Sequence, residues 1–213
     1  MTDTSDYLKS SEFLDRYLWY MGQIKIRIYH INLCLSDSRY PMGHDCIVDQ
    51  IYIHIRKILE LISFSVLSAN FHYLDRKMPG AITEYHASKV MKSAERKFGN
   101  VYPSPVRDVN GEFMPVNPDL YLTRSEFDVL YGFCGDVLHT RNPFKKNKVS
   151  VTKEVILSHL NKIVNLLSVH KAHIAGTPNM YLVQMRSGHL SNPSIHIFTP
   201  TDEVCPVTPG YAP

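Results

Sequence analysis

The segment YGFCGDVLHTRNPF, residues 131–144, brings together side chains that could move a proton and hold an anion. Asp136 precedes His139 by three positions, about one helical turn, so its carboxylate can orient the imidazole and raise its basicity. Arg141 and Asn142 follow as candidate substrate-binding residues. The same two residues also suit an ordinary helix end, because a cation there interacts favourably with the helix dipole. The spacing leaves both interpretations open.

Two glycines share one side of this segment with Asp136 and His139. At about 100° per residue, Gly132 and Gly135 fall roughly opposite an apolar face that we expect to be core. Each glycine costs a helix about 1 kcal/mol, so a neighbour should use the space that it leaves. That neighbour is either another helix or a ligand. The apolar face consists of Phe127, Leu130, Cys134, Val137 and Leu138.

A second polar stripe crosses an otherwise apolar stretch around residues 45–70. Its members are three or four positions apart: Asp49, Tyr52, Arg56, Glu60 and Ser63. Burying an unpaired charge costs several kcal/mol, so the stripe must be paired internally, face solvent or line a cleft. Arg56 and Glu60 are four apart and can pair with each other. All three interpretations of the stripe stay open.

The net charge and the sequence motifs limit the classes of partner, cofactor and metal that we expect. The net charge of +3 permits a nucleic-acid partner without requiring one, and the one dense basic cluster contains Lys145 and Lys146. The motifs GxxxxGK[ST], GxGxxG, GxSxG and HExxH are absent. His170 and His173 lie three apart but lack nearby carboxylate or thiol ligands. We therefore expect neither a cofactor nor a metal.

The cysteines and the apolar runs bear on the compartment. The four cysteines have no CxxC spacing, and three lie in apolar runs, where we expect reduced core thiols. Neither a secretory signal nor an apolar run of 18 residues is recognisable. These features predict a cytoplasmic protein without a membrane partner.

Five helices are expected to position the polar residues. From Ser11, apolar positions three or four apart run to Leu35, and although QIKIRIYHINLCL also alternates like a strand, we favour a helix. A central, mostly buried helix should start at Asp45 or Asp49 and reach Asn70. Thr83 should cap a third helix to about Phe98. In this third helix, Tyr85, Val90 and Ala94 should face inward. Thr123 and Glu126 should form a capping box at the start of the fourth helix. The last helix should run from Ser150 or Thr152 to about Ala172.

The remaining segments are predicted from helix-breaking prolines and from the alternation of apolar and polar residues. Residues 99–119 contain four prolines and are expected to be irregular. The stretches MYLVQM and SIHIF should form a C-terminal two-stranded hairpin that packs on the helices or on a protein partner. The predicted organisation is a helical bundle domain over residues 1–175, followed by a hairpin and tail over residues 176–213.

Three segments resemble a family of uncharacterised bacterial proteins related to the HEPN-like helical bundles. They are IRKILELISFSVLSAN, EYHASKVMKSAERKFGNVYPSP and LYGFCGDVLHTRNPF, within roughly residues 50–175. The resemblance implies a dimeric bundle of four or five helices. It also implies metal-independent RNA cleavage in defence or toxin–antitoxin systems, by a motif in which arginine precedes histidine. In the matching segment here the order is reversed, because His139 precedes Arg141.

Two functions follow from these observations. In the first, the protein binds or cleaves RNA as a homodimer, with His139 as the acid–base group oriented by Asp136. Arg56 or Arg141 would then hold phosphate, and Asn142, Glu60, Lys145 and Lys146 would contact the substrate. In the second, the protein is a non-catalytic dimerisation or interaction module, and Arg56, Glu60, Asp136 and His139 form a structural polar network.

Overall fold

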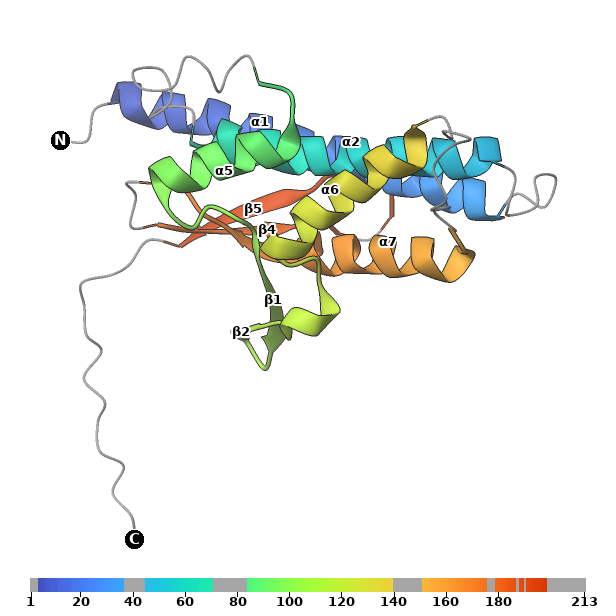
Figure 1. Ribbon diagram of the computed structural model, residues 1–213. Coiled ribbons are helices and arrows are strands. Elements are labelled where there is room, and N and C mark those ends of the chain that lie inside the picture. The colour runs from blue at the N-terminus through green and yellow to red at the C-terminus, as the bar shows by residue number, and fades with distance from the viewer. Residues whose placement is uncertain are drawn as a thin grey trace, which may run out of the picture.

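Helices cover an antiparallel sheet in the part of the chain that the structure describes (Figure 1). The computed structural model describes residues 4–36, 45–70, 84–139, 151–175, 179–186, 188–189 and 191–198. Its helices are α1 (Thr4–Ser36), α2 (Asp45–Ala69), α5 (Ala87–Phe98), α6 (Arg124–Leu138) and α7 (Lys153–Leu167), with the short 3-10 helix η1 (Pro118–Leu120). Its strands are β1 (Ser104–Val109), β2 (Glu112–Pro115), β3 (Val169–Ala172), β4 (Met180–Gln184) and β5 (Ser194–Phe198). The expectation of a mainly helical protein is confirmed.

The two longest helices, α1 and α2, lie side by side (Figure 1). Met21, Ile24 and Ile31 of α1 are fully buried, so a helix rather than a strand over residues 23–35 is confirmed. More than half of the 25 residues of α2 are buried, as expected for the central helix. The core is therefore built around α2.

The shorter helices α5 and α6 pack against α2. Val90 and Ala94 of α5 are buried as predicted, but the inward placement of Tyr85 is wrong, because this residue precedes the helix and is 76% exposed. His86 is the N-cap of α5, and the predicted cap Thr83 lies outside the described residues. α6 begins with the predicted capping box of Thr123 and Glu126.

The prediction of an irregular segment over residues 99–119 is wrong. The segment forms β1, β2 and η1, and the β1–β2 hairpin projects away from the helices (Figure 1). Its turn contains Asn110 and Gly111, both with positive φ, at 56° and 89°. An Asn-Gly pair is a strong hairpin signal, because both central residues of such a turn need this conformation. Two of the four prolines lie where a missing N–H is tolerated: Pro115 ends β2 and Pro118 starts η1.

The last helix is shorter than predicted, and the hairpin is part of a larger sheet. α7 ends at Leu167, and residues 169–172 form β3 instead of helix. β4 and β5 pair as the predicted hairpin, but β4 also pairs with β3, in a sheet of order β2-β1-β3-β4-β5. The division at residues 175 and 176 stays a prediction, although paired strands lie on both sides of it. β5 is an outer strand, and its expected protein partner stays a prediction too.

The contact of Tyr17 with His170 joins the helical layer to the sheet. Both side chains are buried, one on α1 and the other on β3. The Nδ1 of His170 lies 2.9 Å from the carbonyl oxygen of Leu167, which can only accept, so this nitrogen carries the proton. The other ring nitrogen, Nε2, therefore accepts a hydrogen bond from the Tyr17 hydroxyl, whose oxygen lies 2.7 Å from it. Burial lowers the pKa of His170 from 6.5 to about 4.

This lowered pKa predicts an acid-sensitive fold. A histidine held neutral in the folded state takes up a proton more readily when the chain unfolds, so its contribution to stability is complete above pH 6.5. It is lost as the pH falls towards 4, at about 1.4 kcal/mol per pKa unit, or about 3 kcal/mol in all. We expect urea unfolding between pH 7 and pH 4 to show a shallower stability loss for His170→Gln than for the wild type.

The matched control is His196→Gln, which removes an exposed histidine from β5. It should keep the wild-type pH dependence. An unchanged pH dependence in folded His170→Gln would contradict the assignment of this proton to His170.

Candidate functional site

The predicted polar stripe on α2 is anchored to α6 through Arg56. The Nη2 of Arg56 donates to the Tyr131 hydroxyl at 3.0 Å, and the guanidinium carbon lies 4.4 Å from the centre of the same ring. Its Nε is 3.5 Å from Glu60 Oε1, and Lys57 lies 2.6 Å from the other Glu60 oxygen. Arg56 and Glu60 are thus brought together, as the structural alternative requires.

One of the two glycines makes room for this arginine. A Cβ placed on Gly135 would lie 3.5 Å from Nη1 of Arg56, so the predicted close neighbour at Gly135 is confirmed. At Gly132, no described atom comes within 4 Å of such a Cβ. The space at Gly135 is used by a neighbouring helix, which is the structural one of the two alternatives.

Asp136 and His139 lie at the exposed end of α6. His139 is the C-cap residue, and its backbone N–H donates to the Gly135 carbonyl at 3.0 Å. Neither side chain forms a hydrogen bond or ion pair within the part of the chain that the structure describes. The orientation of His139 by Asp136 is therefore not shown. Arg141, Asn142, Lys145 and Lys146 lie outside the described residues.

The nearby thiol and phenol are not activated nucleophiles. Burial raises the pKa of Cys134 to about 12, and burial also raises the pKa of Tyr131 despite the adjacent Arg56. Both groups stay protonated near neutral pH. The core location predicted for the cysteines holds for Cys134, whereas Cys34 is half-buried and Cys46 is exposed.

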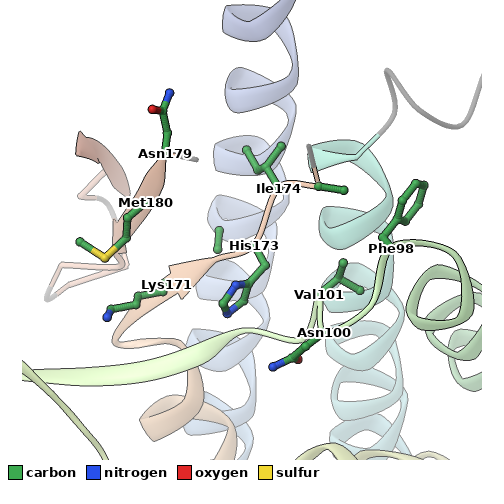
Figure 2. Close-up of a pocket in the computed structure, with 10 residues that line it drawn as sticks. Phe98, Asn100, Val101, Lys171, His173, Ile174, Asn179 and Met180 are labelled. Carbon is green, nitrogen blue, oxygen red and sulfur yellow. The ribbon is translucent and has the colours of Figure 1, made fainter. Parts of the chain in front are cut away.

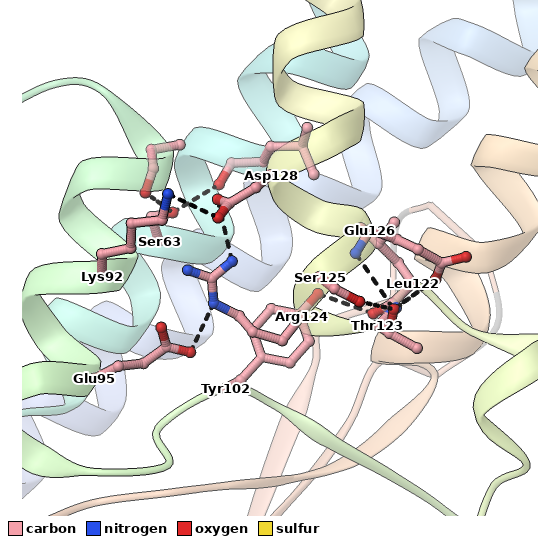
Figure 3. A network of polar contacts seen from close by, with 12 residues as sticks. Ser63, Lys92, Glu95, Tyr102, Leu122, Thr123, Arg124, Ser125, Glu126 and Asp128 are labelled. Carbon is pink, nitrogen blue, oxygen red and sulfur yellow. Dashed lines mark hydrogen bonds and ion pairs between the residues drawn. The ribbon is translucent and has the colours of Figure 1, made fainter.

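A network of ion pairs that sequence reasoning missed fixes α6 to α5 (Figure 3). The Nε of Arg124 lies 2.6 Å from Glu95, and its Nη1 lies 3.1 Å from Asp128. Lys92 reaches Asp128 from α5 at 3.2 Å. Burial alone would lower the pKa of Arg124, but the hydrogen bonds and charges of Glu95 and Asp128 raise it. The network therefore stabilises the bundle and leaves these cations committed to carboxylates.

A further opening lies between α1, the α7–β3 junction and the segment after β4. We call it the α1–α7 cleft; its volume is about 690 Å³. This size and its mixed lining are typical of small-molecule sites. Its apolar members include Ile28, Val164, Leu167, Val169 and Met185. Its polar members are Lys25, Tyr29, Asn32, Ser168, Gln184, Arg186 and His189.

The charged groups among the described lining residues of the cleft are positive. None of its described lining residues carries a carboxylate, whereas Lys25 and Arg186 are cations. Burial lowers the pKa of Lys25, and the positive charge of Arg186 lowers it further. An anion in the cleft would relieve this repulsion.

Lys25 and Arg186 differ in what they can offer a ligand. The Lys25 ammonium contacts the Met185 carbonyl at 2.7 Å, the Arg186 carbonyl at 3.2 Å, and both the carbonyl and hydroxyl oxygens of Ser191. These four acceptors use all three of its protons. The Arg186 side chain is exposed and forms no hydrogen bond or ion pair with another residue that the structure describes. Arg186 is thus the cation available to an anion.

An aromatic pair completes the cleft. The rings of Tyr29 and His189 stack with their centres 3.9 Å apart and their planes 13° from parallel. Stacked rings of this kind present flat faces on which a planar ligand can lie. The cleft therefore combines a flat aromatic surface with an available guanidinium.

A smaller cavity of about 310 Å³ lies where α5 and the neighbouring ends of β3 and β4 meet (Figure 2). His173 lines it, and its Nε2 lies 2.9 Å from the Ser104 hydroxyl. Figure 2 shows Asn179 pointing away from Lys171, His173 and Asn100. Because these polar groups do not converge, this cavity is a weaker candidate than the α1–α7 cleft.

The described residues hold neither a cluster of metal ligands nor a membrane-spanning helix. His30 and His54 stack 5.5 Å apart, yet no group of three or more metal-ligating side chains forms among the described residues. No helix within the same residues is long and apolar enough to span a membrane. Comparison of the chain with family models, curated proteins and solved structures found no match.

The sequence held one signal for the cleft that was missed. Lys25 follows Met21 by four positions and precedes Ile28 by three, so it lies on the inward side of α1. A lysine at an inward position must find oxygen partners, and this marks a site of interest. Tyr29, Arg186 and His189 carried no local signal, because folding alone brings them together.

Gly132 and Gly135 give a direct test of how the exposed face of α6 is used. We expect Gly132→Ala to raise the free energy of unfolding by about 0.5–1 kcal/mol, since alanine favours the helix and meets no neighbour. Gly135→Leu should lower it, because atoms beyond Cβ would displace Arg56 from Tyr131. Thermal and urea unfolding measure both effects. A loss of stability in Gly132→Ala would show that a neighbour does occupy this space.

Proposed function

We propose that the protein is a HEPN-like RNA-binding protein of the bacterial cytoplasm that holds a single-stranded nucleotide in the α1–α7 cleft. One observation carries the proposal: a cleft of about 690 Å³ whose described lining contains two cations and no carboxylate. Such a lining favours an anionic ligand of nucleotide size.

The phosphate would bind at Arg186. An arginine presents a fork of N–H donors that matches the oxygens of a phosphate, and this one has no described partner to give up. Lys25 contributes a second positive charge from beneath the cleft, although its protons are committed to carbonyl and hydroxyl oxygens.

The base would stack on the aromatic pair of Tyr29 and His189. Stacking on such rings accepts any base, so the expected preference is for single strands rather than for one sequence. The amides of Asn32 and Gln184 line the same cleft and can both donate to and accept from a ribose 2′-hydroxyl. The resemblance of three segments to the HEPN-like bundles supports RNA as the nucleic acid.

Binding without cleavage is the form of the proposal that the contacts favour. A metal-independent cleavage at His139 needs a cation beside it to hold the phosphate. Of the two arginines predicted to hold phosphate, Arg56 is already bound to Tyr131 and Glu60, and Arg141 lies outside the described residues. We therefore assign Arg56 a structural role and propose that the protein binds RNA without cleaving it.

The proposal predicts the behaviour of three variants towards a fluorescein-labelled single-stranded RNA. Tyr29→Ala should weaken binding about tenfold or more, as loss of one stacking platform does. Arg186→Ala should weaken it and reduce the salt dependence by about one phosphate contact. Arg107→Ala removes an exposed arginine of β1 and should change little. Fluorescence anisotropy in EDTA at several salt concentrations gives the affinities.

Equal losses in Arg107→Ala and Arg186→Ala would contradict the proposed cleft and indicate non-specific charge attraction. The RNA recovered from the same samples should run at full length on a denaturing gel. Wild-type cleavage that folded His139→Ala abolishes would overturn the assignment of binding without cleavage.

The second candidate function, a homodimerisation module, rests on an exposed apolar stripe of α1. Trp19, Ile26 and Leu33 are 59%, 42% and 44% exposed and lie seven residues apart, so they share one face of the helix. The spacing is symmetrical about Ile26. A second copy packed antiparallel across a two-fold axis would therefore place each Trp19 against a Leu33 of the partner.

The dimer has its own test. Ile26→Lys should convert a dimer into a monomer in sedimentation equilibrium, because it places two charges at the two-fold axis. Val129→Lys is the matched control, since Val129 is 73% exposed on α6, away from the stripe. A wild-type chain that sediments as a monomer at tens of micromolar would exclude this function.

A further inference from the structure

The connection between β4 and β5 carries two of the polar groups of the cleft, Arg186 and His189. Lys25 of α1 contacts the start of this connection. Three consecutive anchors fix its start: Met185 N–H donates to the Ser168 carbonyl at 2.9 Å, and the Met185 and Arg186 carbonyls accept from Lys25. The far side is held through Ser191.

Arg186 has an unfavourable backbone conformation at this point. Its φ is 52°, in the left-handed region that residues with a side chain seldom adopt. Such a conformation persists only where surrounding contacts impose it, and it is frequent at ligand sites. The Lys25 ammonium, 3.2 Å from the carbonyl oxygen of this same residue, is the contact that can impose it.

We infer that Lys25 is a positioning residue: its ammonium holds the β4–β5 connection so that the Arg186 guanidinium faces the cleft. The inference rests on the proposed RNA-binding function for its ligand, but its structural part is independent of that function. Lys25 itself touches no ligand, because its three protons already serve four acceptors.

The choice of a cation for this role fits the ligand. Neutral donors could bind the same carbonyl oxygens, but an ammonium with no carboxylate partner leaves a net positive charge under the cleft. Lys25 and Arg186 repel each other, so an anion bound at Arg186 also lowers the electrostatic energy of Lys25. The group that shapes the connection therefore also favours an anionic ligand.

A double-mutant cycle separates positioning from general structural support. Lys25→Met should weaken RNA binding about tenfold, by about the same factor as Arg186→Ala. Both variants remove the contact between the Arg186 guanidinium and the RNA phosphate. The double variant should bind only slightly more weakly than Arg186→Ala alone, through the loss of the Lys25 charge. A Lys25→Met loss that recurs in full in the Arg186→Ala background would overturn the positioning role. Ser191→Ala, which removes the hydroxyl that accepts from Lys25 and donates to the Gly188 carbonyl, replaces Lys25→Met if that variant does not fold.

A second readout decides the structural part without RNA. Trypsin cleaves after arginine, so the rate of cleavage at Arg186, followed by mass spectrometry, reports how firmly the connection is held. Lys25→Met should accelerate this cut and leave the cut after exposed Arg107 unchanged. Equal rates in wild type and Lys25→Met would overturn the inference. Absence of RNA binding by the wild type together with accelerated cleavage would reject the proposed function alone.

Discussion

The burial of α2 is the constraint on which the rest of the structure depends. This helix is apolar around most of its circumference, so α1, α5 and α6 must cover it on several sides. α1 covers one side and in turn packs against the sheet, through Tyr17 and His170. A helix enclosed between α2 and a sheet needs partners for every polar group on its inner face. Lys25 is such a group, and the β4–β5 connection supplies the oxygens that it requires.

The same constraint accounts for the pairing of Arg56 and Glu60 in the polar stripe of α2. Arg56 and Glu60 lie on the side of α2 that α6 covers, and there they pair with each other and with Tyr131. Arg124, Glu95 and Asp128 then fix α6 to α5 by ion pairs (Figure 3). These cations are matched by carboxylates, whereas those of the α1–α7 cleft are not. That difference, rather than the number of charged residues, is the basis on which we propose an anionic ligand in the cleft.

The sequence predicted those elements whose signals are local. The stripes of α1 and α2 and the capping box of α6 depend on neighbours three or four positions away, and all three were confirmed. The strand β3 was missed because no glycine or proline separates its four residues from α7, and they become a strand only by pairing with β1 and β4. The β1–β2 hairpin was missed for a different reason. Its Asn-Gly pair predicts a hairpin turn, but the surrounding prolines were taken as stronger evidence for an irregular segment.

The candidate site shows the same division. Asp136 and His139 were predicted to act together because they are close in sequence, yet the described structure gives them no shared partner. Tyr29 and His189 are 160 positions apart in the chain and stack face to face. Only the inward position of Lys25 could have indicated the cleft, because a buried ammonium must find oxygens wherever the fold supplies them.

Photochemical cross-linking tests the central claim most directly. A single-stranded RNA containing 4-thiouridine would be bound to the full chain, irradiated and digested, and the cross-linked peptides identified by mass spectrometry. The account predicts cross-links in the α1 peptide that contains Tyr29 and in the connection that contains His189. Cross-links confined to the end of α6 around His139, with none in those two segments, would contradict it.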